Sequence, residues 1–214
     1  GGIVDGVDSV AQRGARGAKP WLIQNVAHGS VANTIIGVLG LTARTMAVSN
    51  QCCSGMDAVG YAATLIANGI ADIAICGGTE APLHRSPLVE FRAAGLTPFS
   101  SEMSDRIARP FDLWRTTGVV GEGACMMVLE AEDSKRKGYS YVSGYGSARD
   151  DTDDVCSGLT TVGKIAMAEA GIKASDIDVI SAWGPGHKQI DRGEALAMER
   201  LFGPSLSDIP AFSI

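Results

Sequence analysis

A cysteine at the turn between a short apolar segment and an amphipathic helix constrains this chain more than any other feature. The residues Ala47-Val48-Ser49 lead into Asn50-Gln51-Cys52-Cys53-Ser54-Gly55, and an alanine-rich helical pattern follows from Met56. A side chain at such a turn is held on rigid backbone, beside the unpaired N–H groups and the positive dipole end of the helix. These effects favour the thiolate, which is the nucleophilic form of cysteine. Cys52 is therefore a candidate nucleophile, and the alternative is a small buried apolar side chain.

Helical and extended patterns alternate along the sequence. The predicted helices cover residues 30–39, 55–68, 88–94, 133–137 and 159–170, and the predicted strands cover residues 45–49, 72–76, 124–129, 139–148 and 177–182. Residues 77–112, apart from the short helix within them, are predicted to be irregular because they contain four prolines. Apolar strands that alternate with helices favour an α/β sheet with helices on both faces.

A last helix has recognisable start and stop signals in the sequence. Asp191 is predicted to cap its first turn and Glu194 to complete a capping box. Gly203-Pro204 is predicted to end it.

Composition and charge exclude several classes of function. The 214 residues are 45% hydrophobic and 20% charged, which suits a folded domain with an apolar core. A net charge of -6 and a pI near 5.0 argue against a nucleic-acid-binding surface. The sequence has no run of apolar residues long enough to predict a membrane span. Two short basic runs, residues 13–19 and 135–137, are either solvated faces or landing sites for an acidic carrier protein.

The cysteine pattern and a glycine-containing segment indicate which cofactors and which cellular location to expect. The five cysteines form no C-x-x-C pair and no cluster with zinc-ligand spacing, so we expect no metal and a reducing, cytoplasmic location. Residues 158–164 approach the pattern of a phosphate-binding loop. Ile165 stands where that loop needs a serine or threonine, and an acidic segment precedes it, so nucleotide binding is not expected.

Five motifs, in order and at matching spacing, resemble the ketosynthase (β-ketoacyl-acyl-carrier-protein synthase) branch of the thiolase-like superfamily. They are Cys52-Cys53-Ser54-Gly55 with its helix, Gly77-Gly78-Thr79-Glu80-Ala81 after an Ala-Asp strand, Arg109-Pro110-Phe111-Asp112 with Arg115, Gly121-Glu122-Gly123-Ala124 before a strand, and Ala182-Trp183-Gly184-Pro185-Gly186-His187 with Asp191 and Glu194 downstream. The resemblance covers nearly the whole chain.

The resemblance implies a thiolase-like layered αβαβα fold, of which this chain holds a part. Residues 1–138 would be the later part of the N-terminal half, with the nucleophile elbow, and residues 139–214 the opening part of the C-terminal half. It also implies a homodimer, or a heterodimer with a related ketosynthase chain, in which the strand at residues 45–49 pairs across a two-fold axis. The acyl carrier protein would be a further partner.

The resemblance implies acyl transfer through a thioester of Cys52, followed by decarboxylative carbon–carbon bond formation in fatty-acid or polyketide synthesis. The substrates would be thioesters of carrier-protein phosphopantetheine or of coenzyme A, with no bound cofactor. Glu80, Arg109 and Asp112 would support the floor and loops of the site through charge-assisted hydrogen bonds.

Two departures from the family pattern touch the expected reaction chamber. Trp183 stands at the position of the family's first catalytic histidine, and Thr116-Thr117-Gly118 replaces the usual Asp-Gly-Phe. The family's catalytic lysine and second histidine would follow Ile214. An indole offers a single N–H donor, and His187 is a candidate substitute donor four residues away. The alternatives to a condensing enzyme are therefore a non-elongating ketosynthase or thiolase-like acyltransferase, and a non-catalytic partner subunit of a ketosynthase dimer.

Overall fold

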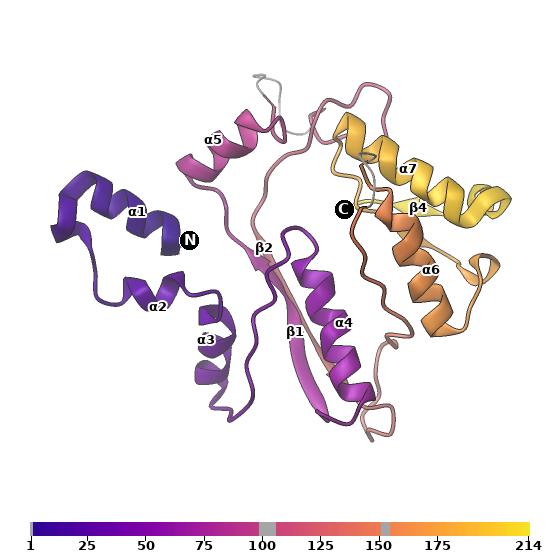
Figure 1. Ribbon diagram of the computed structural model, residues 1–214, viewed down its shortest axis with the longest axis horizontal. Helices are drawn as coiled ribbons and strands as arrows, with labels where there is room; N and C mark the ends of the chain where they lie inside the picture. The colour runs from indigo at the N-terminus through magenta and orange to yellow at the C-terminus, as the bar shows by residue number, and fades with distance from the viewer. Residues whose placement is uncertain (1, 99–105, 151–154) are drawn as a thin grey trace. The chain divides into compact units, whose positions relative to one another are not determined.

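The computed structural model describes residues 2–98, 106–150 and 155–214 (Figure 1). The chain forms two compact units that interleave along the sequence. The first unit comprises Gly1–Pro87 and Gly121–Ala131, and the second comprises Leu88–Val120 and Glu132–Ile214. The predicted division at residue 138 stays a prediction.

The first unit contains a two-stranded sheet with one helix packed against it. Its elements are α1 (Gly2–Arg13), η1 (Gly14–Gly17), α2 (Leu22–Val26), α3 (Ser30–Leu39), α4 (Ser54–Ala67), β1 (Ile73–Glu80) and β2 (Gly123–Glu130). Strands β1 and β2 are antiparallel, with Ile73 opposite Glu130 and Glu80 opposite Gly123. Helix α4 lies along this sheet (Figure 1).

The core of the first unit lies between α4 and one face of the sheet. Val59 and Ala62 of α4 pack with Cys76 of β1, and Ala74 and Leu129 lie against them. These small and branched side chains let the helix approach the sheet closely. Helix α4 ends because Asn68 and then Gly69, with a φ of 65°, leave the helical conformation.

The second unit is built around a pair of helices and two short parallel strands. Helix α5 (Arg85–Ala93) connects the two units along the chain, and the remaining elements are α6 (Gly158–Ala170), η3 (Ala174–Asp176), β3 (Ile180–Ser181), α7 (Lys188–Phe202), η4 (Gly203–Asp208) and β4 (Ala211–Phe212). Helices α6 and α7 pack together, as Figure 1 shows. Ile180 pairs with Ala211 and Ser181 with Phe212.

Two of the predicted strands are absent. Residues 45–49 are largely exposed and form no strand, because no described segment offers them backbone hydrogen bonds. Residues 139–148 are also outside any strand. Their glycines lie against the backbone of α6: a Cβ at Gly144 would come within 2.1 Å of the Ala166 oxygen, and one at Gly146 within 2.3 Å of the Val162 oxygen. This segment therefore packs on a helix instead of pairing with a strand.

Other predicted bounds also need correction. Strand β1 continues to Glu80, four residues into the segment predicted to be irregular, and β3 has only two of the six predicted residues. Residues 133–137 form no helix but a turn followed by a bend, in which the Arg136 N–H donates to the Ser134 hydroxyl at 3.1 Å, a local bond that competes with a helix. Helix α7 begins at Lys188 with His187 as its N-cap residue, so the predicted capping box is wrong.

Candidate active site

Cys52 lies on a tight turn that is closed by its neighbours. The turn runs from Asn50 to the first residue of α4, Ser54, and Gln51 adopts a φ of 51°, which is rare for a residue other than glycine. The Ser54 hydroxyl donates to the Gln51 oxygen at 2.6 Å and accepts the Asn50 N–H at 2.7 Å. The Asn50 side chain donates to Asp57 at 2.6 Å. Unusual backbone conformations of this kind cluster at functional sites.

Two glycines bring the start of α4 directly onto β1 beneath this turn. A Cβ at Gly78 would lie 3.2 Å from the Gly55 Cα, so the two main chains are nearly in contact. A Cβ at Gly77 would lie only 2.1 Å from the Cys125 oxygen on β2. This close approach was not predicted for Gly77-Gly78, although paired glycines within an apolar strand are a signal of it. The sheet thus fixes the turn that carries Cys52.

The cysteines differ in their exposure. Cys52, Cys53 and Cys125 are exposed, whereas Cys76 and Cys156 are buried. Burial raises the pKa of the Cys76 thiol. Burial, followed by the charges of Glu194, Asp150 and Asp191, raises the pKa of the Cys156 thiol to about 11. Both buried thiols are therefore poor nucleophiles near neutral pH. Of the exposed cysteines, Cys125 lies on β2, whereas Cys52 and its neighbour Cys53 lie on the turn before α4.

In the second unit, two buried carboxylates hold the loop that carries Trp183. Glu194 accepts the N–H groups of Trp183 at 2.7 Å and Gly184 at 2.8 Å. Asp191, which has no exposed surface, accepts the Gly186 N–H at 3.0 Å. These residues were predicted to cap the helix. They lie instead inside α7, Asp191 in its first turn and Glu194 in its second, and on its buried side with Ala197; their spacing of three residues, which places them on one helix face, was the available signal.

Asp191 also ties this loop to the segment between Arg109 and Arg115. It accepts the Phe111 N–H at 2.8 Å, and the Arg115 Nε lies 3.3 Å from the same carboxylate oxygen. Arg115 in turn donates to the Lys188 oxygen at 3.0 Å. Asp191 thus accepts two main-chain hydrogen bonds and pairs with the charge of Arg115, although the Arg115 Nε itself makes no hydrogen bond within the described residues, and these contacts tie the loop to the segment.

The candidate site residues are divided between the units. Cys52 and Glu80 belong to the first unit, and Arg109, Asp112, Trp183 and His187 belong to the second. Glu80 accepts the neighbouring Ala81 N–H at 3.1 Å, and Asp112 accepts the Trp114 N–H at 2.7 Å, so the bonds found for these two carboxylates are local ones. Their predicted support of the site, like that of Arg109, stays a prediction.

Trp183 and His187 lie at the two ends of the same loop. Trp183 is 48% exposed, and its main-chain oxygen accepts the Ser213 hydroxyl at 2.8 Å. The Nδ1 atom of His187 is buried and has no hydrogen-bond partner within the described part of the chain. A buried ring nitrogen without a partner is unusual, and it keeps His187 a candidate donor.

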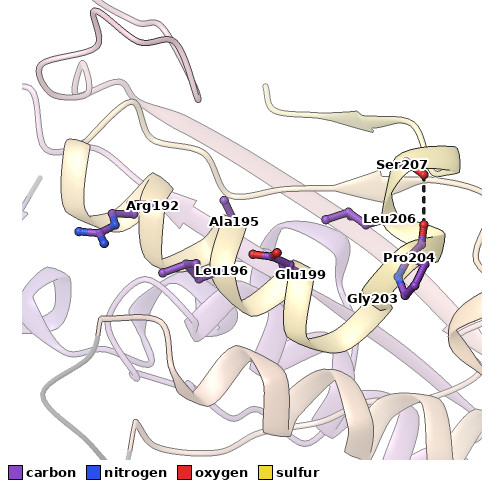
Figure 2. A pocket seen from close by; sticks show the side chains of 8 residues that line it. All are labelled: Arg192, Ala195, Leu196, Glu199, Gly203, Pro204, Leu206 and Ser207. Atoms are coloured by element: carbon purple, nitrogen blue, oxygen red, sulfur yellow. Dashed lines mark hydrogen bonds between the residues drawn. The ribbon is translucent and has the colours of Figure 1, made fainter.

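A groove of about 660 Å³ runs along the outer face of α7 (Figure 2). It is lined by Arg192, Ala195, Leu196, Glu199, Gly203, Pro204, Leu206 and Ser207. None of the candidate site residues lines it. Within the described ranges, no group of three or more histidine, cysteine or acidic side chains could hold a metal ion. The helices described here include none that is long and apolar enough to cross a membrane.

Comparison with known protein families identifies the family of this chain. The sequence model of the β-ketoacyl synthase N-terminal domain matches residues 5–135, and that of the C-terminal domain matches residues 139–212. The chain belongs to the β-ketoacyl synthase family. The family predicted from the five motifs is thereby confirmed.

Individual ketosynthases match almost all of the chain. It is 30% identical to the tetracenomycin polyketide synthase ketoacyl synthase alpha subunit of Streptomyces glaucescens, over 100% of this chain and 54% of that protein. It is 33% identical to 3-oxoacyl-[acyl-carrier-protein] synthase 2 of Rhizobium meliloti, over 97% of this chain and 52% of that protein. The chain thus spans about half the length of these curated relatives.

Solved ketosynthase structures share the fold. One is a type II polyketide synthase acyl-carrier protein in complex with its ketosynthase, bound to a hexaketide; its TM-score is 0.89 at 26% identity, over 99% of this chain and 56% of that one. Another is the ishigamide ketosynthase/chain length factor, with a TM-score of 0.86 at 28% identity, over 99% of this chain and 52% of that one. The predicted thiolase-like fold, present in part, is confirmed.

Proposed function

We propose that this chain is the part of a ketosynthase that carries the acyl group on Cys52 during decarboxylative condensation in fatty-acid or polyketide synthesis. The observation that carries the proposal is the strained, glycine-supported turn that presents Cys52 at the start of α4. Membership of the β-ketoacyl synthase family and the names of the curated relatives support it. The proposed partners are an acyl carrier protein and a second ketosynthase-type chain.

The first step is transfer of an acyl group to sulfur. The Cys52 thiolate attacks the carbonyl carbon of an acyl thioester of phosphopantetheine or coenzyme A, and the departing thiolate takes up a proton. The oxyanion that forms in between needs hydrogen-bond donors, and the backbone N–H of Cys52 at the start of α4 is the proposed one. No cofactor enters this step, because the thioester is itself the substrate.

The second step joins two carbon atoms. A malonyl-type thioester loses carbon dioxide, and the resulting enolate carbon attacks the carbonyl of the Cys52 thioester. The new carbon–carbon bond replaces the carbon–sulfur bond, and the Cys52 thiolate leaves. Donors that face the enolate oxygen stabilise this charge, and Trp183 stands where the family motif has such a donor.

A second function is favoured by that same substitution. A chain that loads Cys52 but lacks a full set of enolate donors would pass its acyl group to another acceptor, as a non-elongating ketosynthase or acyltransferase does. The exposed Cys52 argues against the third alternative, a partner subunit without catalysis. Both catalytic alternatives load an acyl group onto Cys52, but only the condensing enzyme goes on to form a carbon–carbon bond.

Cysteine mapping tests the role of Cys52. We expect limiting iodoacetamide at pH 8 to label Cys52 before the other cysteines, and an acyl thioester to modify it alone. Cys156 should label slowest, because its pKa of about 11 leaves little thiolate at that pH. The matched control is Cys125→Ala, which removes an exposed cysteine outside the turn and should leave acyl loading unchanged, whereas Cys52→Ala should abolish it. Faster labelling of Cys125 or Cys53 would contradict the assignment.

A further inference from the structure

Gly118 lies against the main chain of the loop that carries Trp183. A Cβ atom at this position would come within 2.5 Å of the Pro185 oxygen, closer than a real Cβ approaches any atom. The φ of Gly118 is not in the left-handed region, so its backbone conformation is open to any residue. Space, and not backbone conformation, therefore restricts this position to glycine.

The loop cannot move away from Gly118 at low cost. Pro185 stands between Gly184 and Gly186, whose N–H groups are held by Glu194 at 2.8 Å and by Asp191 at 3.0 Å. Both carboxylates are buried. A shift of the Pro185 carbonyl would strain or break these charge-assisted bonds.

The segment before Gly118 is fixed as well. Thr117 is 6% exposed, and its hydroxyl donates to the Gly95 oxygen at 3.0 Å. The Thr117 oxygen lies 3.1 Å from the place of a Cβ at Gly186. The two segments are thus in main-chain contact at two successive points, and each is anchored to its own support.

We propose that Gly118 is a positioning residue for the loop Trp183–His187. The two departures from the family pattern, at Thr116-Thr117-Gly118 and at Trp183, then form one coupled change, because the loop main chain fills the space that a side chain at position 118 would need. Gly118 acts on the proposed reaction only through this loop. The catalytic consequence rests on the proposed function, whereas the structural coupling does not.

Fluorescence tests the coupling without reference to catalysis. Trp21→Phe and Trp114→Phe leave Trp183 as the single tryptophan of this chain, and both replaced rings are mostly exposed. In that background we expect Gly118→Ala to shift the emission maximum of Trp183 and to change its quenching by acrylamide. The matched control is Gly121→Ala, where a Cβ would meet nothing within 4 Å and φ is also outside the left-handed region. This control should leave the emission unchanged.

Hydrogen exchange gives a second readout. Gly118→Ala should lower the protection of the peptide that contains the Gly184 and Gly186 amides by about tenfold, the loss expected when a hydrogen bond to a charged group breaks. If Gly118→Ala does not fold, the variant Gly118→Ala with Pro185→Gly is tested. The added backbone freedom lets the peptide between residues 185 and 186 turn away at the cost of the Gly186–Asp191 hydrogen bond, so folding should return with an unprotected Gly186 amide. Unchanged emission and protection in a folded Gly118→Ala, or no recovery in the double variant, would overturn the proposal.

Kinetics then separates this proposal from the proposed function. With a working condensation assay, Gly118→Ala should slow condensation more than acyl loading of Cys52, which lies on another turn. A fluorescence change with no acylation of Cys52 in the parent would refute the proposed function and leave the coupling intact. Equal losses in loading and condensation, with no change in the loop, would refute the positioning role alone.

Discussion

At Trp183 the main chain is fixed more firmly than the side chain. Its N–H donates to Glu194 and its oxygen accepts the Ser213 hydroxyl, while the residue as a whole is 48% exposed. A substitution at this position therefore changes the chemical group that is presented and leaves the loop in place. This makes Trp183 a suitable position at which to exchange one hydrogen-bond donor for another.

We expect Trp183→His to raise the rate of decarboxylative condensation by roughly 100-fold while acyl loading changes little, because one enolate donor is typically worth about a hundredfold or more in rate. The comparison uses a polypeptide that includes the family's catalytic lysine and second histidine, with a malonyl thioester as the extender. Trp183→Phe is the control, since it removes the indole N–H and adds no donor. Equal and substantial condensation in the parent and in Trp183→His would show that another group, such as His187, supplies the hydrogen bond.

At the scale of elements, three helices and the two paired strands β1 and β2 follow from local sequence, whereas the predicted helix at residues 133–137 and the predicted strands at residues 45–49 and 139–148 do not form. Helix α3 has the predicted bounds, and α4 and α6 each begin one residue earlier than predicted. These helices are predictable because an amphipathic pattern and a glycine that ends the helix both lie within the segment itself. A strand needs a partner, and the patterns at residues 45–49 and 139–148 say nothing about whether one is near.

The same distinction applies to the candidate site. Motifs identified Cys52 and the loop of Trp183, since these depend on residue type and order. The role of Asp191 depends on a contact with Phe111, 80 residues away, and that of Gly118 on a contact with Pro185, so no local pattern contains them. Glu194 contacts Trp183, 11 residues away, through the fold of the loop before α7. Asp191 and Glu194 were therefore predicted to cap the helix, and no role was predicted for Gly118, because the sequence alone does not show these tertiary contacts.

Helix α7 and its preceding loop should depend strongly on the charge of Asp191. We expect Asp191→Asn to lower the free energy of unfolding by about 3–5 kcal/mol, because Arg115 would lose its counter-charge in a largely buried site. Urea denaturation monitored by circular dichroism measures this change. Asp178→Asn, at an exposed position, is the control and should change stability by less than about 0.5 kcal/mol. A loss below about 1 kcal/mol for Asp191→Asn would mean that water screens this pair as at a surface.

At the scale of the whole molecule, apolar surface is left uncovered by the described residues. In the sheet of the first unit, one face packs on α4 and the other carries Ile73 and Ile75 of β1 with Met126 and Val128 of β2. These four side chains are between 41% and 58% exposed. Met46, in the segment before the Cys52 turn, is 50% exposed. Contiguous apolar surface of this kind usually marks contact with more protein.

We therefore expect the protein to be at least a dimer, with residues 45–49 at the contact. An extended apolar segment with unpaired N–H and C=O groups is stabilised when a second chain adds a strand beside it. Val48→Lys would place a charge in this contact, so it should dissociate the protein or unfold it. Sedimentation velocity across micromolar concentrations measures the association, and Tyr139→Lys, at a fully exposed position, is the control that should leave it unchanged. A stable, folded monomer for the parent protein would show that residues 45–49 need no partner chain, and it would leave the exposed face of the sheet to be covered from within the same polypeptide.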